Sequence, residues 1–412
     1  MLKPADVVAG LVDRPGLAWL DGADDTGTIV TWDPVDVVTR ADGWPAAGRA
    51  RTRAVATGAA PFTGGVLGYV GYGAGHVVDA VPRCAPTPEP DVWLGRFDGG
   101  LCWRGGEWTV AGTPGFRRDA ERVLAAAGAR PPPPAPSAPR ADTDDRAGFE
   151  ARVERVRAWI AEGDCYQVNL SRPVRVPAAG DPFHAYLRLR SRPAAYGAFL
   201  RPSDEIAVLS NSPELLLSQR GRRLRSVPIK GTRPRSADPA RDAAFRAELE
   251  ASPKDRAELT MITDLVRNDL GRVARVGTVR AEERQLTDHP TLFHTSWPVE
   301  AELAEGLDAW DALAAVFPPG SVTGAPKVRA CQRIAELEPA PRGVYCGAIG
   351  YVADGGDATW SVAIRVAVFD GADARYHVGG GIVDGSDPAA EWEETVTKEL
   401  ALRRALVRLD PS

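Results

Sequence analysis

The chain has 412 residues, of which 50 are lysine or arginine and 55 are aspartate or glutamate, so the formal net charge is 50 − 55 = −5. This length suits one large domain or two ordinary ones, and the mild acidity argues against nucleic acid or an anionic membrane as the main partner. No apolar run approaches the roughly 18 residues that span a bilayer, and the first residues lack a signal-peptide pattern, so we expect a cytoplasmic protein.

Residues 1–125 form an N-terminal region rich in short runs that are typical of strands. The runs at 28–32, 64–73 and 91–97 alternate apolar residues with glycines. The glycine-rich run 64–73 lacks the strand–turn–helix frame and the following acidic residue of a dinucleotide-binding fingerprint. We therefore predict a tight strand pair at 64–73 and no nucleotide site.

The composition changes at 126–145, where four consecutive prolines favour an extended polyproline conformation. We interpret this segment as a proline-rich linker between the N-terminal region and a larger region at 146–412. A surface loop within a single domain is the alternative, and the sequence supports the two about equally.

The region 146–412 combines many strands with fewer, longer helices. Apolar residues at helical spacing predict a helix over 149–160 that ends at Gly163, and two more helices are predicted over 253–270 and 388–409. Strand patterns lie at 166–170, 205–210, 223–232, 344–352, 359–369 and 374–383. Because strands dominate, we predict an α+β fold with mostly antiparallel sheets.

Three glutamates occupy positions that suit a metal site. Glu258 lies on the edge of the apolar stripe of helix 253–270, where an unpaired buried carboxylate costs on the order of several kcal/mol. Glu391 and Glu394 lie three residues apart on one face of the last helix and can bind one hard cation together. The three would form an all-oxygen site for Mg²⁺. A salt bridge for Glu258 and a solvated charged face for the other two are the alternatives, and spacing alone favours that charged face.

Lys230 and a glycine run add groups that can hold a ligand. Lys230 ends a predicted strand just before Gly231 and Thr232, where its amine can be held against a ligand. The run Gly379, Gly380 and Gly381 follows a strand and lets backbone N–H groups approach a carboxylate or phosphate, although a turn or bulge is the better interpretation of the run alone. These residues indicate an enzyme-like cluster but no particular reaction.

A series of motifs across 146–412 carries a resemblance to a known family. The motifs, in chain order, are GDCYQVNLSR (163–172), SNSPELLL (210–217), PIKGTRPR (228–235), KDRAELTMITDLVRNDLGRV (254–273), HTS (294–296), GSVTGAPKVRA (320–330), GAIGYV (347–352), AIR (363–365) and the run from GGGIV to the last lysine (379–398). The N-terminal region fits more loosely, through 61–72. With these motifs the chain resembles the chorismate-utilising enzymes, and among them the aminodeoxychorismate synthase component I type most closely.

The resemblance implies a particular form of the α+β fold, similar to that of anthranilate synthase component I. Two large, mainly antiparallel sheets would pack together with flanking helices, and the strands of 1–125 would complete the sheets of a chorismate-binding catalytic region at 146–412. The segment 126–145 would then be a loop. The resemblance also implies chorismate as the substrate and Mg²⁺ as the cofactor.

The resemblance assigns roles to individual residues of this sequence. The metal-site acids are Glu258, Glu391 and Glu394, with Asp255 beside them, although the spacing of Asp255 from Ser252 also suits a helix cap. The substrate-binding set comprises Gly231, Thr232, Tyr345, Arg365, Gly379, Gly380, Gly381 and Lys398. The catalytic set comprises Lys230, Glu214 and His294.

Two positions distinguish reactions within this family. Isochorismate and salicylate synthases carry a water-activating lysine where this chain has Gln167, and anthranilate synthases carry alanine where it has Lys230. The resemblance therefore implies formation of 4-amino-4-deoxychorismate, on the route to p-aminobenzoate and folate. The Lys230 amine would attack C2 of chorismate, Glu214 would protonate the leaving C4 hydroxyl, and ammonia would then attack C4.

The source of ammonia is expected to lie outside this chain. A glutaminase needs an exposed nucleophilic cysteine on a strand–turn–helix elbow, and none of the five cysteines lies in a G-x-C-x-G setting. We therefore expect a separate glutaminase subunit as partner. The alternatives are anthranilate synthase component I, with Lys230 as a neutral variation, and a non-catalytic subunit that binds the glutaminase.

Overall fold

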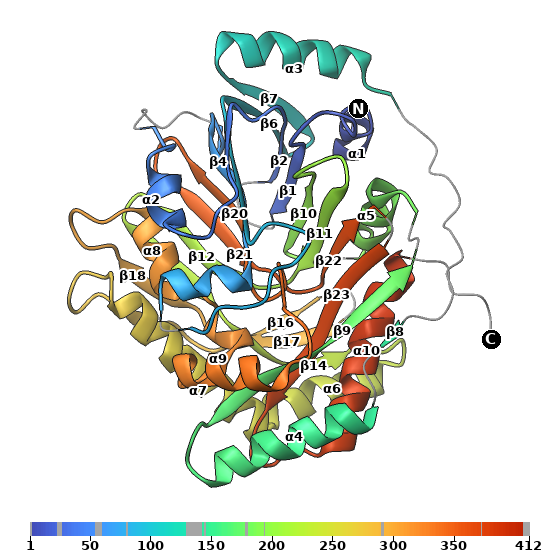
Figure 1. Cartoon of the computed structure of the whole chain (residues 1–412), viewed down its shortest axis with the longest axis vertical. Coiled ribbons are helices and arrows are strands. Elements are labelled where there is room, and N and C mark those ends of the chain that lie inside the picture. Colours follow the sequence, from blue (N-terminus) through green and yellow to red (C-terminus); the bar gives the residue numbers. More distant parts are fainter. Residues whose placement is uncertain are drawn as a thin grey trace.

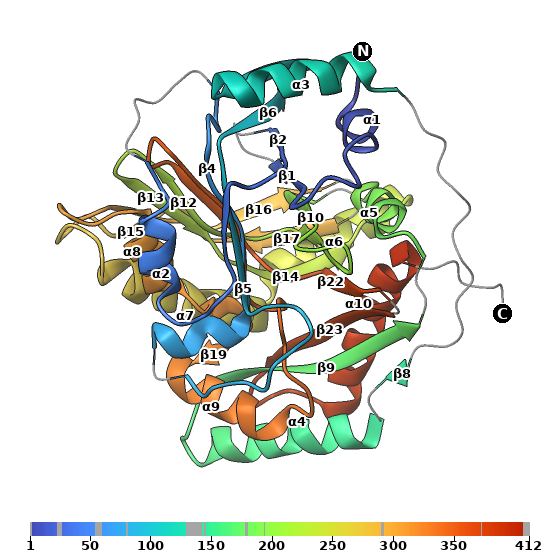
Figure 2. The same cartoon turned by 45° about the horizontal axis from the view of Figure 1, so that its top comes forward.

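The computed structural model describes residues 2–22, 27–53, 60–79, 81–128, 142–143, 146–177, 180–192, 194–289, 292–371 and 373–406. Within these ranges the strands form two large sheets and one small sheet, with helices around them (Figures 1 and 2). Every pairing between the described strands is antiparallel. The predicted α+β fold with two large antiparallel sheets is confirmed.

The first sheet joins strands from both ends of the chain. Its order in the described residues is β19 (Gly324–Ala325), β9 (Gln167–Pro177), β23 (Asp373–Ile382), β22 (Val366–Asp370), β11 (Ile206–Ser212), β10 (Tyr196–Leu200), β1 (Ala18–Gly22), β2 (Thr28–Thr31), β6 (Gly99–Arg104) and β7 (Glu107–Gly112), with β8 (Asp142–Thr143) on β9. Strands of the first 125 residues therefore extend this sheet directly.

The second and third sheets are smaller. The second runs β15 (Arg280–Ala281), β18 (Val299–Glu302), β13 (Arg223–Val227), β12 (Leu215–Arg220), β21 (Ala358–Val362), β20 (Ala348–Ala353), β4 (Gly65–Val70), β5 (Val92–Phe97) and β3 (Asp36–Val38). The third runs β14 (Ile229–Pro234), β17 (Leu292–Ser296) and β16 (Gln285–Asp288).

The helices lie around these sheets. They are α1 (Pro4–Val8), α2 (Trp44–Arg49), α3 (Pro114–Ala126), α4 (Arg146–Ala161), α5 (Pro182–Arg190), α6 (Pro239–Ala251), α7 (Pro253–Gly271), α8 (Ala309–Val316), α9 (Lys327–Leu337) and α10 (Pro388–Leu406), with the 3₁₀ turns η1 (Tyr72–Val77) and η2 (Gly320–Val322). Helix α10 packs against β23, and α7 packs against β14. No helix in the described ranges is long and apolar enough to cross a membrane.

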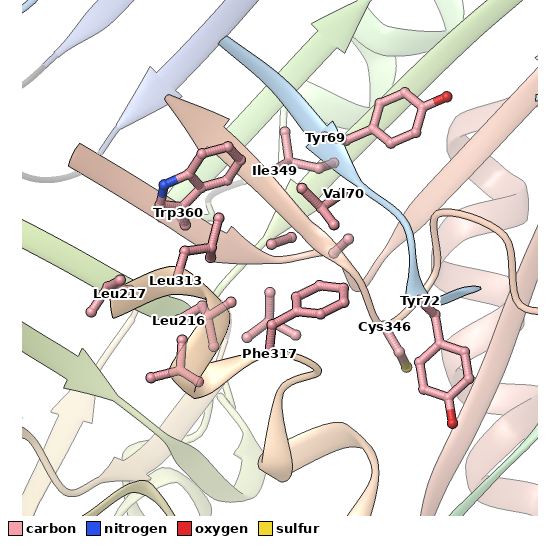
Figure 3. Packing of buried hydrophobic residues seen from close by; sticks show 14 of the residues in the cluster. Tyr69, Val70, Tyr72, Leu216, Leu217, Leu313, Phe317, Cys346, Ile349 and Trp360 are labelled. Atoms are coloured by element: carbon pink, nitrogen blue, oxygen red, sulfur yellow. The ribbon is translucent and has the colours of Figure 1, made fainter. Parts of the chain in front are cut away.

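Two hydrophobic cores explain the layering. Leu20 of the first sheet packs in the same cluster as Leu67 and Trp360 of the second sheet, whereas the neighbouring Trp19 belongs to a cluster with Phe183 of α5. Successive side chains of a strand point to opposite faces, so one strand serves both clusters. Figure 3 shows part of the larger cluster, where residues of β4, β12, β20 and β21 surround the end of α8.

Two predicted strands are each broken in two. The run 223–232 divides at Pro228 into β13 of the second sheet and β14 of the third, and the run 359–369 divides before Arg365 into β21 and β22. Proline cannot donate to a strand ladder, and Arg365 has a φ of +50°, so each break lets the chain change sheets. Both Lys230 and Arg365 are positioned by such a break.

The prediction of a tight strand pair at 64–73 is wrong. Only Gly65–Val70 is a strand, β4, and it pairs with β5 and β20 before the chain turns into η1. Most of the predicted linker 126–145 lies outside the described residues. The division of the chain into regions at that segment therefore stays a prediction, although the topology shows early strands in both large sheets.

Candidate active site

The strand β14 carries three predicted site residues and is shaped by a glycine. Gly231 has a φ of +76°, and a Cβ there would lie 2.9 Å from the Asp255 side chain and 2.8 Å from that of Leu249. Glycine at this position therefore lets β14 bulge and lie close to the first turn of α7. The bulge falls between Lys230, which is half-buried, and Thr232, which is exposed.

Asp255 ties β14 to the start of α7. The Ser252 hydroxyl accepts a hydrogen bond from the Asp255 backbone N–H at 3.2 Å, which caps the helix as the spacing predicted. The Asp255 carboxylate in turn accepts a hydrogen bond from Nη2 of Arg233, on β14, at 3.2 Å. These contacts fix the distance between the strand that bears Lys230 and the helix that bears Glu258.

Lys230 and Glu214 meet at Ser321, a residue of η2. The Lys230 Nζ donates a hydrogen bond to the Ser321 carbonyl oxygen at 2.9 Å. The Ser321 side chain acts to lower the pKa of the Glu214 carboxyl, which lies between β11 and β12. Glu214 is 5% exposed and Ser321 is 4% exposed, so the amine and the carboxyl share a neighbour that is shielded from water.

The carboxyl of Glu214 has an unusual pKa. Burial raises the pKa of Glu214 to about 7, against the opposing effects of the Ser321 side chain, the Lys230 charge and the backbone N–H of Ile229. A carboxyl with this pKa is protonated in about half of the molecules at neutral pH. Glu214 can therefore donate a proton near pH 7, as a general acid must.

The predicted metal-site acids come together from α7 and α10. Burial raises the pKa of Glu258 on α7, and the charges of Asp255 and Glu391 raise it further. Burial likewise raises the pKa of Glu391, with Glu394 adding to the effect. A Cβ on Gly380 would lie 3.3 Å from Oε2 of Glu391 and 3.4 Å from Oε1 of Glu394, so both carboxylates lie against this glycine of β23.

Glu394 is partly neutralised by Lys398. Its side chain is 53% exposed, and the Lys398 Nζ lies 2.7 Å from Oε1 and donates to the Gly379 carbonyl oxygen at 2.7 Å. Desolvation by the surrounding protein acts to raise the pKa of Glu394, but the Lys398 ammonium, with Lys254 and Lys230, brings that pKa below its ordinary value. Lys398 therefore holds α10 against the glycine run.

The donor set fits magnesium by its chemistry. All three side chains offer carboxylate oxygens. Burial raises the pKa of Glu258 and Glu391, neighbouring carboxylates add to this, and a divalent cation would offset both effects. Across the described ranges, no three histidine, cysteine, aspartate or glutamate side chains are arranged to hold one metal ion by themselves. The carboxylates thus suit Mg²⁺ that keeps waters and takes further oxygens from a substrate.

His294 and Arg365 lie near one another in the site. His294 on β17 lies opposite Thr232 and is buried. Burial lowers the pKa of His294 to about 4, and His289 and Arg365 add to the effect. The ring is therefore neutral at pH 7. Desolvation and the charge of Arg192 lower the pKa of Arg365, whose guanidinium has no hydrogen bond or ion pair within the described part of the chain. A guanidinium in this state suits an anionic ligand.

The glycine run lies within β23 and not after it. Gly379–Gly381 pairs with β9, whereas the described pairing of β22 with β23 stops at Tyr376, so β22 leaves the other edge of the run unpaired. A Cβ on Gly381 would lie 2.3 Å from Nε2 of Gln167. The Gln167 amide is fully buried, and neither its nitrogen nor its oxygen has a hydrogen-bond partner among the described residues. Buried polar groups ordinarily have a partner, so this amide suits a contact with water or with a polar ligand.

The ring contacts of Tyr345 in the described residues are with His377 and Arg342, neither of which is a predicted site residue. Its ring stacks on that of His377 with the centroids 5.5 Å apart, and the Arg342 guanidinium lies 5.7 Å from its centroid. Tyr345 and His377 line a cavity of about 200 Å³ whose described lining includes no other predicted site residue. A substrate-binding role for Tyr345 stays a prediction.

Sequence patterns missed the contribution of Ser321. The residue lies in GSVTGAPK, a motif that carried only the family resemblance, and its backbone carbonyl is the group that holds Lys230. A carbonyl acceptor leaves no signal in residue type, so only the proximity of η2 to β14 reveals it. The resemblance draws attention to Gln167, but the sequence does not predict that its amide is buried and without a partner among the described residues.

A family model described as chorismate binding enzyme matches residues 16–404. The chain belongs to the chorismate-binding enzyme family. Its relatives have names that state different activities. It is 39% identical over 391 residues to anthranilate synthase component 1 of Streptomyces coelicolor, covering 88% of this chain and 76% of that protein. It is 40% identical over 354 residues to aminodeoxychorismate synthase component 1 of Klebsiella aerogenes, covering 82% and 76%.

The fold of this chorismate-binding family member also matches a solved structure. The crystal structure of anthranilate synthase component I from Streptococcus pneumoniae superposes with a TM-score of 0.82 at 26% identity, covering 91% of this chain and 92% of that chain. The two proteins are therefore similar in the arrangement of their sheets as well as in sequence. Because relatives with two different names are about equally similar, the choice between activities has to come from the residues of the site.

Proposed function

We propose that this chain is the synthase component that converts chorismate and ammonia to 4-amino-4-deoxychorismate, the aminodeoxychorismate synthase component I activity. The observation that carries the proposal is the pairing of the Lys230 amine with the Glu214 carboxyl at Ser321, with the carboxyl half protonated at neutral pH. A nucleophile and an acid at one buried place are what displacement of a hydroxyl requires. Gln167 in place of a lysine supports ammonia over water as the incoming group.

The reaction proceeds in two displacements. The neutral amine of Lys230 attacks C2 of chorismate, the ring double bond shifts, and the C4 hydroxyl leaves as water with the proton that Glu214 gives up. Ammonia then attacks C4, the double bond shifts back, and the Lys230 nitrogen leaves C2. The proton lost by the incoming ammonia returns to the site, so the sum is chorismate plus ammonia giving the C4 amine plus water.

The remaining residues hold the substrate for this reaction. Arg365 offers its unpaired guanidinium to a carboxylate of chorismate, and the free edge of Gly379–Gly381 offers backbone groups. Thr232 and the neutral His294 lie opposite one another on β14 and β17, close to Lys230. Glu258, Glu391 and Glu394 would hold Mg²⁺, which supplies charge neutralisation for a second substrate carboxylate.

The ammonia is proposed to come from a separate glutaminase subunit. Burial raises the pKa of all five cysteine thiols, to about 11 for Cys84 and Cys102 and to about 12 for Cys346. Thiols in this state are poor nucleophiles at neutral pH, since the thiolate is the reactive form. The cysteines of this chain therefore do not suit hydrolysis of glutamine.

Anthranilate synthase component I is the second candidate, because a relative of that name is 39% identical. The discriminating experiment is mass-resolved chromatography after incubating the purified chain with chorismate, Mg²⁺ and ammonium at mildly alkaline pH. The proposal expects an amine at C4 with the enolpyruvyl group intact. Anthranilate would favour the second candidate, and chorismate that binds without turnover would favour a non-catalytic subunit.

A further inference from the structure

The guanidinium of Arg342 lies at the centre of a buried hydrogen-bond network beside the site. Arg342 lies between α9 and β20, and its side chain is 1% exposed. Nε and Nη2 donate to the two carboxylate oxygens of Glu338 at 2.8 and 2.6 Å, which is the two-pronged geometry of a strong ion pair. Because Glu338 is only 4% exposed, this pair is shielded from water and each charge is neutralised within the protein.

The same guanidinium holds two segments of backbone. Its Nη1 donates to the Val322 carbonyl oxygen at 3.0 Å, and its Nη2 donates to the Asn169 carbonyl oxygen at 2.6 Å. Val322 belongs to η2, and Asn169 belongs to β9. A guanidinium is planar and rigid, so its donors fix the distance between the two acceptors. Arg342 therefore fastens η2 to β9 through its side chain, and a substitution of Arg342 removes this connection.

Each of the two segments carries a group of the proposed site. The Val322 carbonyl directly follows that of Ser321, which accepts a hydrogen bond from the Lys230 Nζ at 2.9 Å. Asn169 lies two residues after Gln167, whose amide lies against the glycine run of β23. Arg342 therefore sets the spacing between the turn that holds the Lys230 amine and the strand that bears Gln167.

The orientation of the guanidinium is itself fixed by neighbouring side chains. Its Cζ lies 4.9 Å from the ring centroid of Tyr72, which Figure 3 labels, and 5.7 Å from that of Tyr345. Glu338 in turn accepts from the backbone N–H and the hydroxyl of Ser171, at 2.7 and 2.8 Å, so its carboxylate is anchored to β9. Arg342 is therefore held in place by the protein before any substrate binds.

We propose that Arg342 is a positioning residue that holds η2, and through the Ser321 carbonyl the Lys230 amine, at a fixed place beside β9. The importance of Lys230 rests on the proposed function, but the connection from Arg342 to Lys230 is a property of the protein alone. A displacement of the attacking nitrogen by about 1 Å can cost on the order of 10²-fold in rate. Loss of the planar fork should therefore slow the chemical step more than it weakens substrate binding.

The test uses Arg342→Lys, which keeps a positive charge for Glu338 but lacks the fork that reaches both carbonyl oxygens. Arg96→Lys is the matched control. Arg96 makes a similarly buried two-pronged pair with Asp354, at 2.9 and 2.8 Å, and has no hydrogen bond to η2 or β9 among the described residues. Urea unfolding measures how much stability each variant loses.

The reactivity of the Lys230 amine is then measured in the folded chains without substrate. Each chain is labelled with a trace of acetic anhydride, and mass spectrometry gives the acetylation of Lys230 relative to that of Lys254, whose side chain is 59% exposed. Arg342→Lys should raise this ratio by at least about threefold, the effect of loosening one hydrogen bond, because an amine that Ser321 no longer holds is more accessible. Arg96→Lys should leave the ratio unchanged.

Turnover should show the opposite change. Arg342→Lys should lower kcat by about 10- to 100-fold with KM little changed, although its Lys230 amine is more reactive towards the reagent. Arg342→Met combined with Glu338→Gln leaves no unpaired buried charge and should give the same two results, so it replaces Arg342→Lys if that variant does not fold.

An unchanged labelling ratio in the Arg342 variants overturns the proposal, and so does an equal rise in Arg96→Lys. A wild-type chain that forms no C4 amine contradicts the proposed function instead. In that case the labelling still decides the role of Arg342, because it requires no turnover.

Discussion

Lys230 and Glu214 share one neighbour, Ser321, whose carbonyl oxygen accepts from the Lys230 Nζ at 2.9 Å and whose side chain acts to lower the pKa of the Glu214 carboxyl. The three residues come from three separate parts of the chain: β14, the turn between β11 and β12, and η2. In Figures 1 and 2, β14 lies between α7 and α10, which carry the acidic residues.

The pH dependence of turnover should report Glu214. A general acid must be protonated, so the rate should fall as the pH rises through the raised pKa of about 7. Glu214→Gln should lower kcat by about 10²- to 10⁴-fold and abolish this alkaline limb. Steady-state kinetics from pH 5.5 to 9, in about half-unit steps, measure both effects, and an unchanged limb in Glu214→Gln would assign it to another group.

Glu214 should make the free energy of unfolding fall as pH rises, whereas a carboxylate whose pKa is lowered by folding makes it rise. The pKa of Glu214 is raised in the folded chain from 4.5 to about 7, so the native state binds the extra proton between these values. The free energy of unfolding should therefore fall as pH rises from about 4.5 to about 7, by on the order of 3 kcal/mol, and then level off.

Glu214→Gln should remove this pH dependence, because glutamine carries no ionisable proton. Urea unfolding of the two chains at several pH values gives the difference directly. The variant should gain stability relative to the wild type as pH rises. A difference that stays constant between pH 4.5 and 7 would mean that the Glu214 carboxyl is not desolvated as described.

The acidic residues of α7 and α10 should control the magnesium requirement. Glu258→Gln and Glu394→Gln should each abolish turnover at moderate Mg²⁺, since metal sites with few carboxylates lose much affinity when one is neutralised. Glu393→Gln is the matched control, because Glu393 is a neighbour on α10 that pairs with Arg146 at the surface. A titration of kcat against Mg²⁺ concentration separates the variants, and undiminished turnover in Glu258→Gln would contradict the assigned site.

Arg365 should contribute more to the affinity for chorismate than to kcat. The unpaired guanidinium offers a two-pronged contact to a carboxylate, so Arg365→Ala should weaken chorismate binding by about 10- to 100-fold. Arg365→Lys should recover only part of this loss, because a lysine keeps the charge without the planar fork. Calorimetric titration with chorismate measures the binding, and equal affinities in all three chains would place the carboxylate elsewhere.

Local sequence signals predicted the helices of the site closely. The helix expected over 253–270 is α7, Pro253–Gly271, because Ser252 caps it and Pro253 suits its first turn. Glu391 and Glu394 lie on one face of α10 as their spacing predicted, because helical spacing is a local property.

Contacts between distant segments were not predictable in the same way. The continuous apolar pattern of 223–232 conceals the break at Pro228, since membership of a sheet depends on strands far away in the chain. The glycines at 64–73 bring β4 close to its neighbours: a Cβ on Gly68 would lie 1.9 Å from the Trp93 carbonyl oxygen. A close approach to another strand and a tight turn require the same residue type, so the sequence alone does not separate them.

The most direct test of the account is to look for the covalent intermediate on Lys230. The chain would be incubated with chorismate and Mg²⁺ in the absence of ammonium, then digested and analysed by mass spectrometry, with Lys230→Arg as the charge-preserving control. The account predicts that the peptide containing Lys230 gains the mass of chorismate minus water, and that ammonium releases the C4 amine from it. Full-rate C4 amination by Lys230→Arg, with no adduct on the wild-type chain, would contradict it.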